Sequence, residues 1–157
     1  MRSMNPWLSM VALSVMATAV MGRLTPGDDT PPPKEPVVPA IDFALIDLGG
    51  TTHHLRQNDG RRVRAFVFLS TECPVSNGYT ATLNELHGAF ADDDVDFFGI
   101  VADPTVTRMQ ATKHFDDFKT TFPILFDASG LLLRALEPAY VPEAVVLDRD
   151  GKLVYRG

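Results

Sequence analysis

The stretch Val63–Asn77, VRAFVFLSTECPVSN, joins two kinds of secondary structure and contains the only cysteine of the 157-residue chain, Cys73. Residues 63–69 are almost continuously aromatic or branched, which is typical of a strand that is buried on both faces. Pro74 suits the first position of a helix, and apolar residues follow it at spacings of three and four: Val75, Tyr79, Leu83, Leu86 and Phe90. The stretch therefore predicts a buried strand, a turn, and a helix that begins beside Cys73 and buries this apolar stripe.

Strands and helices alternate on both sides of this stretch. Strands are predicted over residues 41–48, 51–55, 63–69, 95–101, 122–127, 143–148 and 152–157. Further helices are predicted to begin at Asp103-Pro104, with Val106, Met109, His114 or Phe115, and Phe118 on the apolar side, and at Ser129. The alternation favours an α/β sandwich with parallel core strands. Arg149-Asp150-Gly151 predicts a hairpin turn, so the sheet should be mixed.

Residues 1–40 differ in composition from the rest of the chain. Arg2 precedes an uncharged run, Trp7–Met21, that contains the small residues Ala17-Thr18-Ala19, and this pattern predicts a secretory signal. The uncharged span is also close to the length of a membrane helix, so an uncleaved anchor is the alternative. Residues 23–40 are rich in proline and predict a semi-rigid linker. We expect a signal peptide or N-terminal membrane anchor over 1–22, a linker over 23–40, and an extracytoplasmic domain, periplasmic or secreted, over 41–157.

The charge pattern argues against nucleic acid as a partner. The net charge is −6, and the basic residues are scattered rather than gathered in one patch. No cofactor or metal is expected. His53 and His54 are adjacent, so on a strand they would point to opposite faces and would not chelate one ion together, and we interpret them as exposed turn residues.

Cys73 has the setting of a reactive thiol. Unpaired backbone N–H groups and the positive end of the helix dipole both favour a thiolate at the start of a helix. We expect Thr71 and Asn77 to be hydrogen-bond donors around it. The alternative is a small buried residue with no chemical role, since free cysteines are often buried.

Four motifs in order resemble the thioredoxin fold and, within it, the redoxin branch, which includes the alkyl hydroperoxide reductase/thiol-specific antioxidant family. They are the opening FALIDLGG, the Cys-Pro at a helix start, FPILFD, and the closing VPEAVVLDRDGKLVYRG, and together they span Ile41–Gly157. The resemblance implies a thioredoxin-like three-layer α/β/α sandwich with a central mixed sheet. It also implies that Pro142 is a cis proline facing Cys73. The usual final helix has no counterpart in this sequence, so we expect either a partner over one sheet face or an exposed apolar surface.

The chain departs from the better-known chemistries of these relatives. Ser76 stands where thioredoxins have their second cysteine, and a hydroxyl cannot resolve a mixed disulfide. Asn77 stands where copper-delivering members have theirs, which leaves a poor site for a soft metal. Ser70 matches the hydroxyl residue of the peroxiredoxin motif, but Phe66 replaces its proline, and Pro142 occupies the place of its activating arginine.

The resulting hypothesis is an exported monothiol redox protein. The expected site residues are Cys73, Ser70, Thr71 and Pro142. The expected partners are a thiol/disulfide protein or a peroxide as substrate and an external thiol as reductant, with a possible membrane tether through residues 1–22. The alternative is a non-catalytic thioredoxin-fold binding or scaffold module tethered near the membrane.

Overall fold

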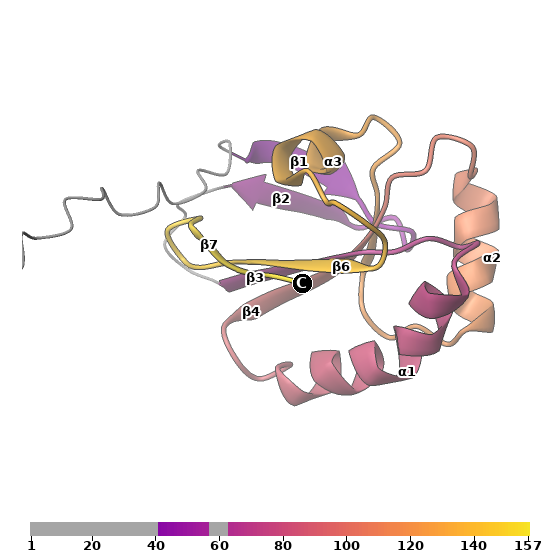
Figure 1. The fold of residues 1–157 in the computed structure, drawn as a ribbon, viewed down its shortest axis with the longest axis horizontal. Helices are drawn as coiled ribbons and strands as arrows, with labels where there is room; N and C mark the ends of the chain where they lie inside the picture. The colour runs from indigo at the N-terminus through magenta and orange to yellow at the C-terminus, as the bar shows by residue number, and fades with distance from the viewer. Residues whose placement is uncertain (1–40, 57–62) are drawn as a thin grey trace, which may run out of the picture. The chain divides into compact units, whose positions relative to one another are not determined.

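A five-stranded mixed sheet forms the centre of the part of the chain that the structure describes (Figure 1). The structure is a computed structural model that describes residues 41–56 and 63–157, so the predicted signal or anchor and the predicted linker lie outside the described residues. The strands are β1 (Asp42–Ile46), β2 (Thr52–Arg56), β3 (Val63–Phe68), β4 (Val95–Val101), β5 (Ile124–Phe126), β6 (Glu143–Leu147) and β7 (Leu153–Arg156). The helices are α1 (Pro74–Ala89), α2 (Arg108–Asp117) and α3 (Leu131–Leu136). In the part of the chain that is described, no helix is both long enough and apolar enough to span a bilayer.

The strand order is β5-β4-β3-β6-β7, with β3 in the middle. β3 and β5 both run parallel to β4, whereas β6 runs antiparallel to β3 and β7 antiparallel to β6. Gly151 takes a φ of 76° in the turn between β6 and β7, a left-handed conformation that glycine adopts without strain. The predicted mixed sheet and the predicted hairpin are therefore confirmed.

One face of the sheet is covered by the antiparallel β1–β2 hairpin and by α3 (Figure 1). We call it the closed face. Its core contains side chains with no exposed surface, namely Phe66, Ile100, Leu125, Leu132 and Val145. Asp127, also fully buried, begins α3 by accepting hydrogen bonds from the backbone N–H groups of Leu131 (2.7 Å) and Leu133 (3.1 Å). Because its carboxylate satisfies N–H groups that a helix start leaves unpaired, it stabilises α3 on the sheet.

The other face is covered only in part, by α1 and α2, and we call it the open face. Its core includes Leu83 of α1 and Phe115 of α2. The prediction that all the apolar residues of the α1 stripe are buried is wrong, because Val75, Tyr79, Leu86 and Phe90 are exposed. They face a part of the sheet that no described element covers. Leu83 is the one residue of the stripe that is buried. Ser76 and Thr80 are the other buried residues of α1.

The start of α2 also differs from the prediction. The helix begins at Arg108 rather than at Asp103-Pro104. Thr107 and Gln110 form a capping box, in which each side chain accepts a hydrogen bond from the backbone N–H of the other. This pairing satisfies the first N–H groups of the helix and sets its starting point. Met109 is exposed as a result, and Phe115 is the residue that reaches the core.

Candidate active site

Cys73 lies where the turn after β3 meets the N-terminus of α1. It is the N-cap residue, with an extended backbone, and Pro74 follows in the first turn. The side chain is partly exposed. Its Sγ lies 3.8 Å from the carbonyl oxygen of Val141, and the Val141-Pro142 peptide bond is cis. The prediction that Pro142 is a cis proline in a loop facing Cys73 is confirmed.

The pKa of the Cys73 thiol is lowered from its ordinary value of 9.0. The main cause is hydrogen bonding from the backbone N–H of Ser76, with smaller contributions from the Ser76 hydroxyl and the backbone N–H of Val75, while partial burial acts in the opposite direction. In the neutral form the S–H group points to the carbonyl oxygen of Val141. Loss of the proton turns the sulfur into an acceptor for the donors of the first helical turn, so the site favours the thiolate.

Ser76 is the residue whose contribution the sequence reasoning missed. It is almost fully buried, and its Oγ accepts a hydrogen bond of 3.3 Å from the backbone N–H of Ser70. The hydroxyl proton therefore remains available for the sulfur of Cys73. A serine three residues after the N-cap is a sequence signal for such a donor, because side chains of the first turn lie close to the cap. The same substitution that removes a resolving thiol thus adds a group that stabilises the thiolate.

The predicted site residues Ser70 and Thr71 lie in the turn before Cys73, but they differ in their contacts. The carbonyl oxygen of Ser70 accepts a hydrogen bond of 3.4 Å from the backbone N–H of Cys73, and its Oγ accepts one of 3.2 Å from the backbone N–H of Glu72. These contacts shape the turn that presents Cys73. Thr71 is partly exposed in the same turn, and no hydrogen bond joins it to another described residue. Direct roles for either hydroxyl on a substrate stay predictions.

An ion pair between the buried Glu143 and the more exposed Arg156 holds the loop that carries Pro142. Glu143, which is 2 % exposed, accepts a hydrogen bond of 2.8 Å from the backbone N–H of Ala139 and lies 3.6 Å from Nη1 of Arg156. Arg156 also donates to the carbonyl oxygens of Leu136 (2.7 Å) and Glu137 (2.9 Å). Strand β7, the end of α3 and the start of β6 are thereby joined, and this fixes the loop opposite Cys73. The sequence reasoning did not identify this pair.

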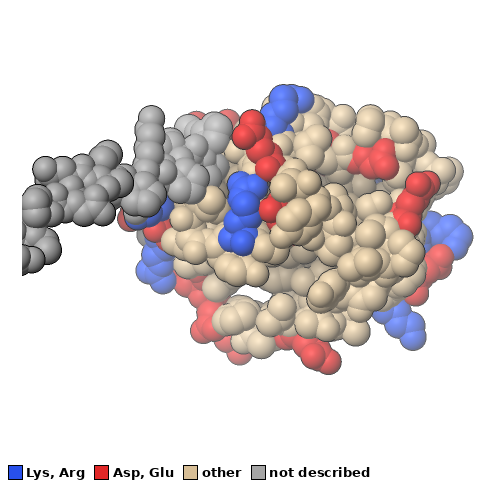
Figure 2. All heavy atoms as spheres, viewed as in Figure 1, with Lys and Arg blue, Asp and Glu red and all other residues tan. Residues whose placement is uncertain are grey.

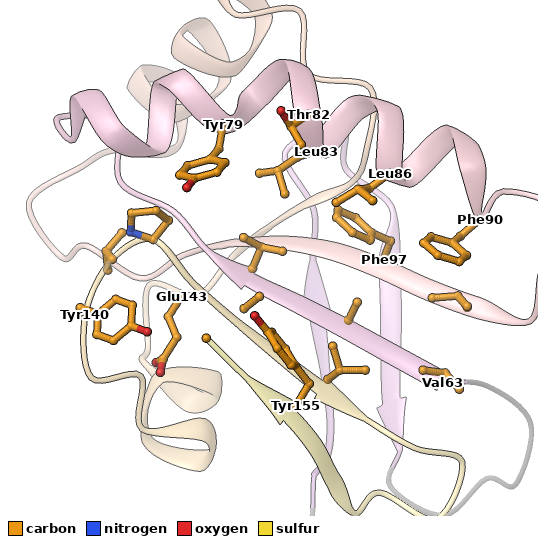
Figure 3. A pocket seen from close by; sticks show the side chains of 18 of the residues that line it. Val63, Tyr79, Thr82, Leu83, Leu86, Phe90, Phe97, Tyr140, Glu143 and Tyr155 are labelled. Atoms are coloured by element: carbon orange, nitrogen blue, oxygen red, sulfur yellow. The ribbon is translucent and has the colours of Figure 1, made fainter.

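An apolar groove of about 860 Å³ runs along the open face between α1 and the sheet. Val75, Tyr140, Val141 and Pro142 line the end nearest Cys73. Further along, Tyr79, Leu83 and Leu86 of α1 point toward the sheet, as does Phe90 directly after the helix, and Tyr155 of β7 stands opposite them (Figure 3). Figure 2 shows the same region as a hollow bordered largely by uncharged residues. The groove thus gives the cysteine an adjoining apolar surface.

The histidines give no metal site among the described residues. Within residues 41–56 and 63–157, no three His, Cys, Asp or Glu side chains are grouped so that they could hold an ion.

His53 is not the exposed turn residue that was expected, because it lies on β2 and its Nε2 is 2.7 Å from a carboxylate oxygen of Asp47. Burial raises the pKa of Asp47, but hydrogen bonds from His53 and from the backbone of Thr51 and Gly49 outweigh it, so the net pKa is lowered.

The chain is similar to known thiol-disulfide oxidoreductases in sequence and to solved structures in fold. Thiol-disulfide oxidoreductase ResA of Geobacillus thermodenitrificans is 29% identical over 115 residues, which cover 73% of this chain and 64% of the relative. This chain thus matches less than two thirds of the length of that relative. Two solved structures share the fold. A secreted Mycobacterium tuberculosis disulfide oxidoreductase homologous to E. coli DsbE has a TM-score of 0.61 at 21% identity, over 73% of this chain and 81% of that one. StoA from Bacillus subtilis has a TM-score of 0.66 at 19% identity, over 78% and 90%.

These likenesses confirm the predicted thioredoxin-like α/β fold. The Redoxin family model matches residues 33–157, which include every described strand and helix. The match also includes Cys73 and the cis Pro142 that faces it. The chain is therefore a member of the Redoxin family.

Proposed function

We propose that this protein is a monothiol redox protein in which Cys73 is the nucleophile. The observation that carries the proposal is the position of the thiol. Cys73 is the N-cap residue of α1, and its Sγ lies 3.8 Å from the Val141 carbonyl oxygen beside the cis proline. Its pKa is lowered, mainly by hydrogen bonding from the backbone N–H of Ser76. The thiol-disulfide oxidoreductase activity of the relatives supports the same class of reaction.

The reaction with a disulfide takes place in two exchanges. The Cys73 thiolate attacks one sulfur of the substrate, a new bond forms between Sγ and that sulfur, and the other substrate sulfur leaves as a thiolate that takes up a proton. Since the chain has no second cysteine, an external thiol must then attack the mixed disulfide and release Cys73. With a peroxide, the thiolate attacks one oxygen, the O–O bond breaks, an alcohol or water leaves, and a sulfenic acid remains for the external thiol to reduce.

The test is a pH titration of thiol reactivity with the purified chain. The rate of alkylation by iodoacetamide should rise with an inflection below pH 9.0, the ordinary pKa of the thiol. Incubation with oxidised glutathione should add one glutathione per chain, and dithiothreitol should remove it. Cys73→Ser should show neither reaction. A wild-type thiol that stays unreactive up to pH 9.0 would overturn the proposal.

The apolar groove favours a second candidate, a non-catalytic binding module. Exposed apolar surfaces of this kind are common at sites of interaction. The Cys73→Ser variant separates the two candidates, because it should abolish a redox role and leave a binding role intact. Loss of the biological role in a folded Cys73→Ser protein would contradict the binding module.

We also propose that the protein is exported. The support is the uncharged run Trp7–Met21 after Arg2, together with the secreted disulfide oxidoreductase that shares the fold. Fractionation of cells that express the full chain should place it outside the cytoplasm. The intact mass of the recovered protein would report whether residues 1–22 are removed, and recovery in the cytoplasm alone would contradict export.

A further inference from the structure

We propose that Asn77 and His114 act together on Cys73. In this proposal the Asn77 amide donates a hydrogen bond to the thiolate, and His114 is the positioning residue that holds the amide over the first turn of α1. The inference rests on the proposed function, because it concerns how the reactive thiol of that function is stabilised. It adds two residues, one on a second helix, to the site formed by Cys73, Val75 and Ser76.

The spacing along α1 places Asn77 beside Cys73. The two residues are four positions apart, and the backbone N–H of Asn77 donates to the carbonyl oxygen of Cys73 at 3.1 Å, as in a regular helical turn. Side chains four residues apart lie on one face of a helix, and each tilts toward the N-terminus. The partly buried Asn77 side chain therefore covers the turn that begins at the cysteine.

The contact with His114 determines which group the amide presents. Nε2 of His114 lies 2.9 Å from Oδ1 of Asn77. Because Oδ1 can only accept, Nε2 must carry the proton and donate it. The Nδ2 group of Asn77 then remains as a donor, and it makes no hydrogen bond to any other residue that the structure describes. A thiolate at Cys73, the N-cap residue one turn before Asn77, is an acceptor at the start of the same helix.

The surroundings of His114 hold its ring in place. The ring packs against Phe118 with centroids 4.6 Å apart and against Phe115 with centroids 5.1 Å apart. Burial lowers the pKa of His114, and the charge of Asp117 on the same helix opposes this only in part. The imidazole is therefore neutral near neutral pH, and its single proton is the one that Asn77 accepts. From α1, the polar group that bonds to the ring is the uncharged amide of Asn77.

The experiment compares iodoacetamide titrations of Cys73 in a matched set of variants. Asn77→Ala should raise the pH of the inflection by about 0.5 to 1 unit, since the thiolate loses a hydrogen-bond donor. His114→Phe keeps the aromatic packing but removes the donor to Asn77, and should shift the inflection in the same direction. His114→Gln keeps an N–H donor and should restore much of the wild-type value.

Asn84→Ala is the control. Asn84 also links α1 to the segment after α2, through hydrogen bonds with Lys119 (2.9 Å) and with Thr121 (2.9 and 3.1 Å), but it lies further along the helix. This variant removes a contact between α1 and the segment after α2 without touching Cys73, so its inflection should equal that of wild type. An equal shift in Asn84→Ala would mean that Asn77 and His114 act only through helix packing, and would overturn the proposal.

The double variant Asn77→Ala/His114→Phe supplies a second criterion. If His114 acts through Asn77, the double variant should show the same shift as Asn77→Ala alone, whereas additive shifts would contradict the coupling. A wild-type inflection at or above pH 9.0 would overturn this inference together with the proposed function. A lowered wild-type inflection that neither single variant moves would overturn the inference alone.

Discussion

The two faces of the sheet differ in how completely they are covered. On the closed face, Phe66, Leu125 and Leu132 have no exposed surface, and the β1–β2 hairpin and α3 cover the sheet. On the open face, α1 covers part of the sheet, and the apolar groove of about 860 Å³ remains beside it. Both faces are built from apolar side chains, so composition does not distinguish them. What distinguishes them is whether a further element lies over those side chains.

This difference separates the part of the domain that stabilises the fold from the part that carries the chemistry. Burial of apolar surface is the main stabilising contribution in folding, and the closed face holds the larger core of fully buried side chains. Cys73, Ser76, Asn77 and His114 all lie on elements of the open face or at its edge. Substitutions on the closed face should therefore change stability, and substitutions on the open face should change reactivity and binding.

The largest expected effect is a contrast between two leucines. Leu132 of α3 has no exposed surface, whereas Leu86 of α1 is 42% exposed beside the apolar groove. Leu132→Ala should lower the free energy of unfolding by about 2 to 5 kcal/mol, because it leaves a cavity in a packed core. Leu86→Ala should lower it by less than about 1 kcal/mol. Urea unfolding of both variants measures the contrast, and equal losses would mean that the two faces are equally packed.

A substitution in the apolar groove should have a smaller effect on the free energy of unfolding and a clear effect on the binding of a hydrophobic dye. The wild-type protein should bind a hydrophobic dye such as anilinonaphthalene sulfonate, since an apolar groove of this size is open to solvent. Leu86→Glu should reduce the dye fluorescence while changing the free energy of unfolding by about 0.5 kcal/mol. Met109→Glu is the control, because Met109 is 79% exposed on α2 and does not line the groove. Absence of dye binding by the folded wild-type protein would contradict an open groove.

The smallest expected effect is a dependence of the free energy of unfolding on pH. His114 on the open face and Asp47 beside the β1–β2 hairpin should contribute to it in two different pH ranges. Burial lowers the pKa of His114 below 6.5 in the folded state, so the unfolded chain binds more protons and stability falls as the pH drops below that value. The pKa of Asp47 is also lowered, and its contribution is present above 3.8 and lost as the pH falls through its folded pKa.

Urea unfolding as a function of pH checks these two windows. His114→Phe should flatten the loss of stability just below pH 6.5 and leave the loss below pH 3.8 in place. Asp47→Asn should do the reverse, because it removes the carboxylate that pairs with His53. An unchanged pH profile in either variant would mean that the group makes no contribution in its window.

Much of the fold could be predicted because local patterns and topology agree. The buried strands, the hairpin at Gly151 and the helix after Pro74 each have a local signal, and the cis Pro142 followed from the family resemblance. The start of α2 was misplaced because Asp103-Pro104 and Thr107 are both acceptable helix starts. The reciprocal bonds between Thr107 and Gln110 decide between them, and a periodicity argument does not weigh such bonds.

The candidate site was predicted less completely than the fold. Cys73 was identified from its place between a strand and a helix, but Ser76 was seen only as a missing thiol. The sequence pattern indicates only that His114 or Phe115 lies on the apolar side of a helix. Its contact with Asn77 joins positions 37 residues apart, and no local pattern indicates a pairing over that separation. The ion pair between Glu143 and Arg156 was missed for the same reason.

The sequence by itself determined the order of strands and helices, the position of a lone thiol at a helix start, and the family, because these depend on neighbours along the chain. Only the tertiary structure decided which apolar stripe is buried and which polar groups reach the sulfur. The stripe on α1 has the spacing of a core-facing stripe, yet most of it is exposed. Whether a residue is buried depends on what packs opposite it. That is set by the arrangement of elements distant in sequence rather than by the spacing of apolar residues along the helix.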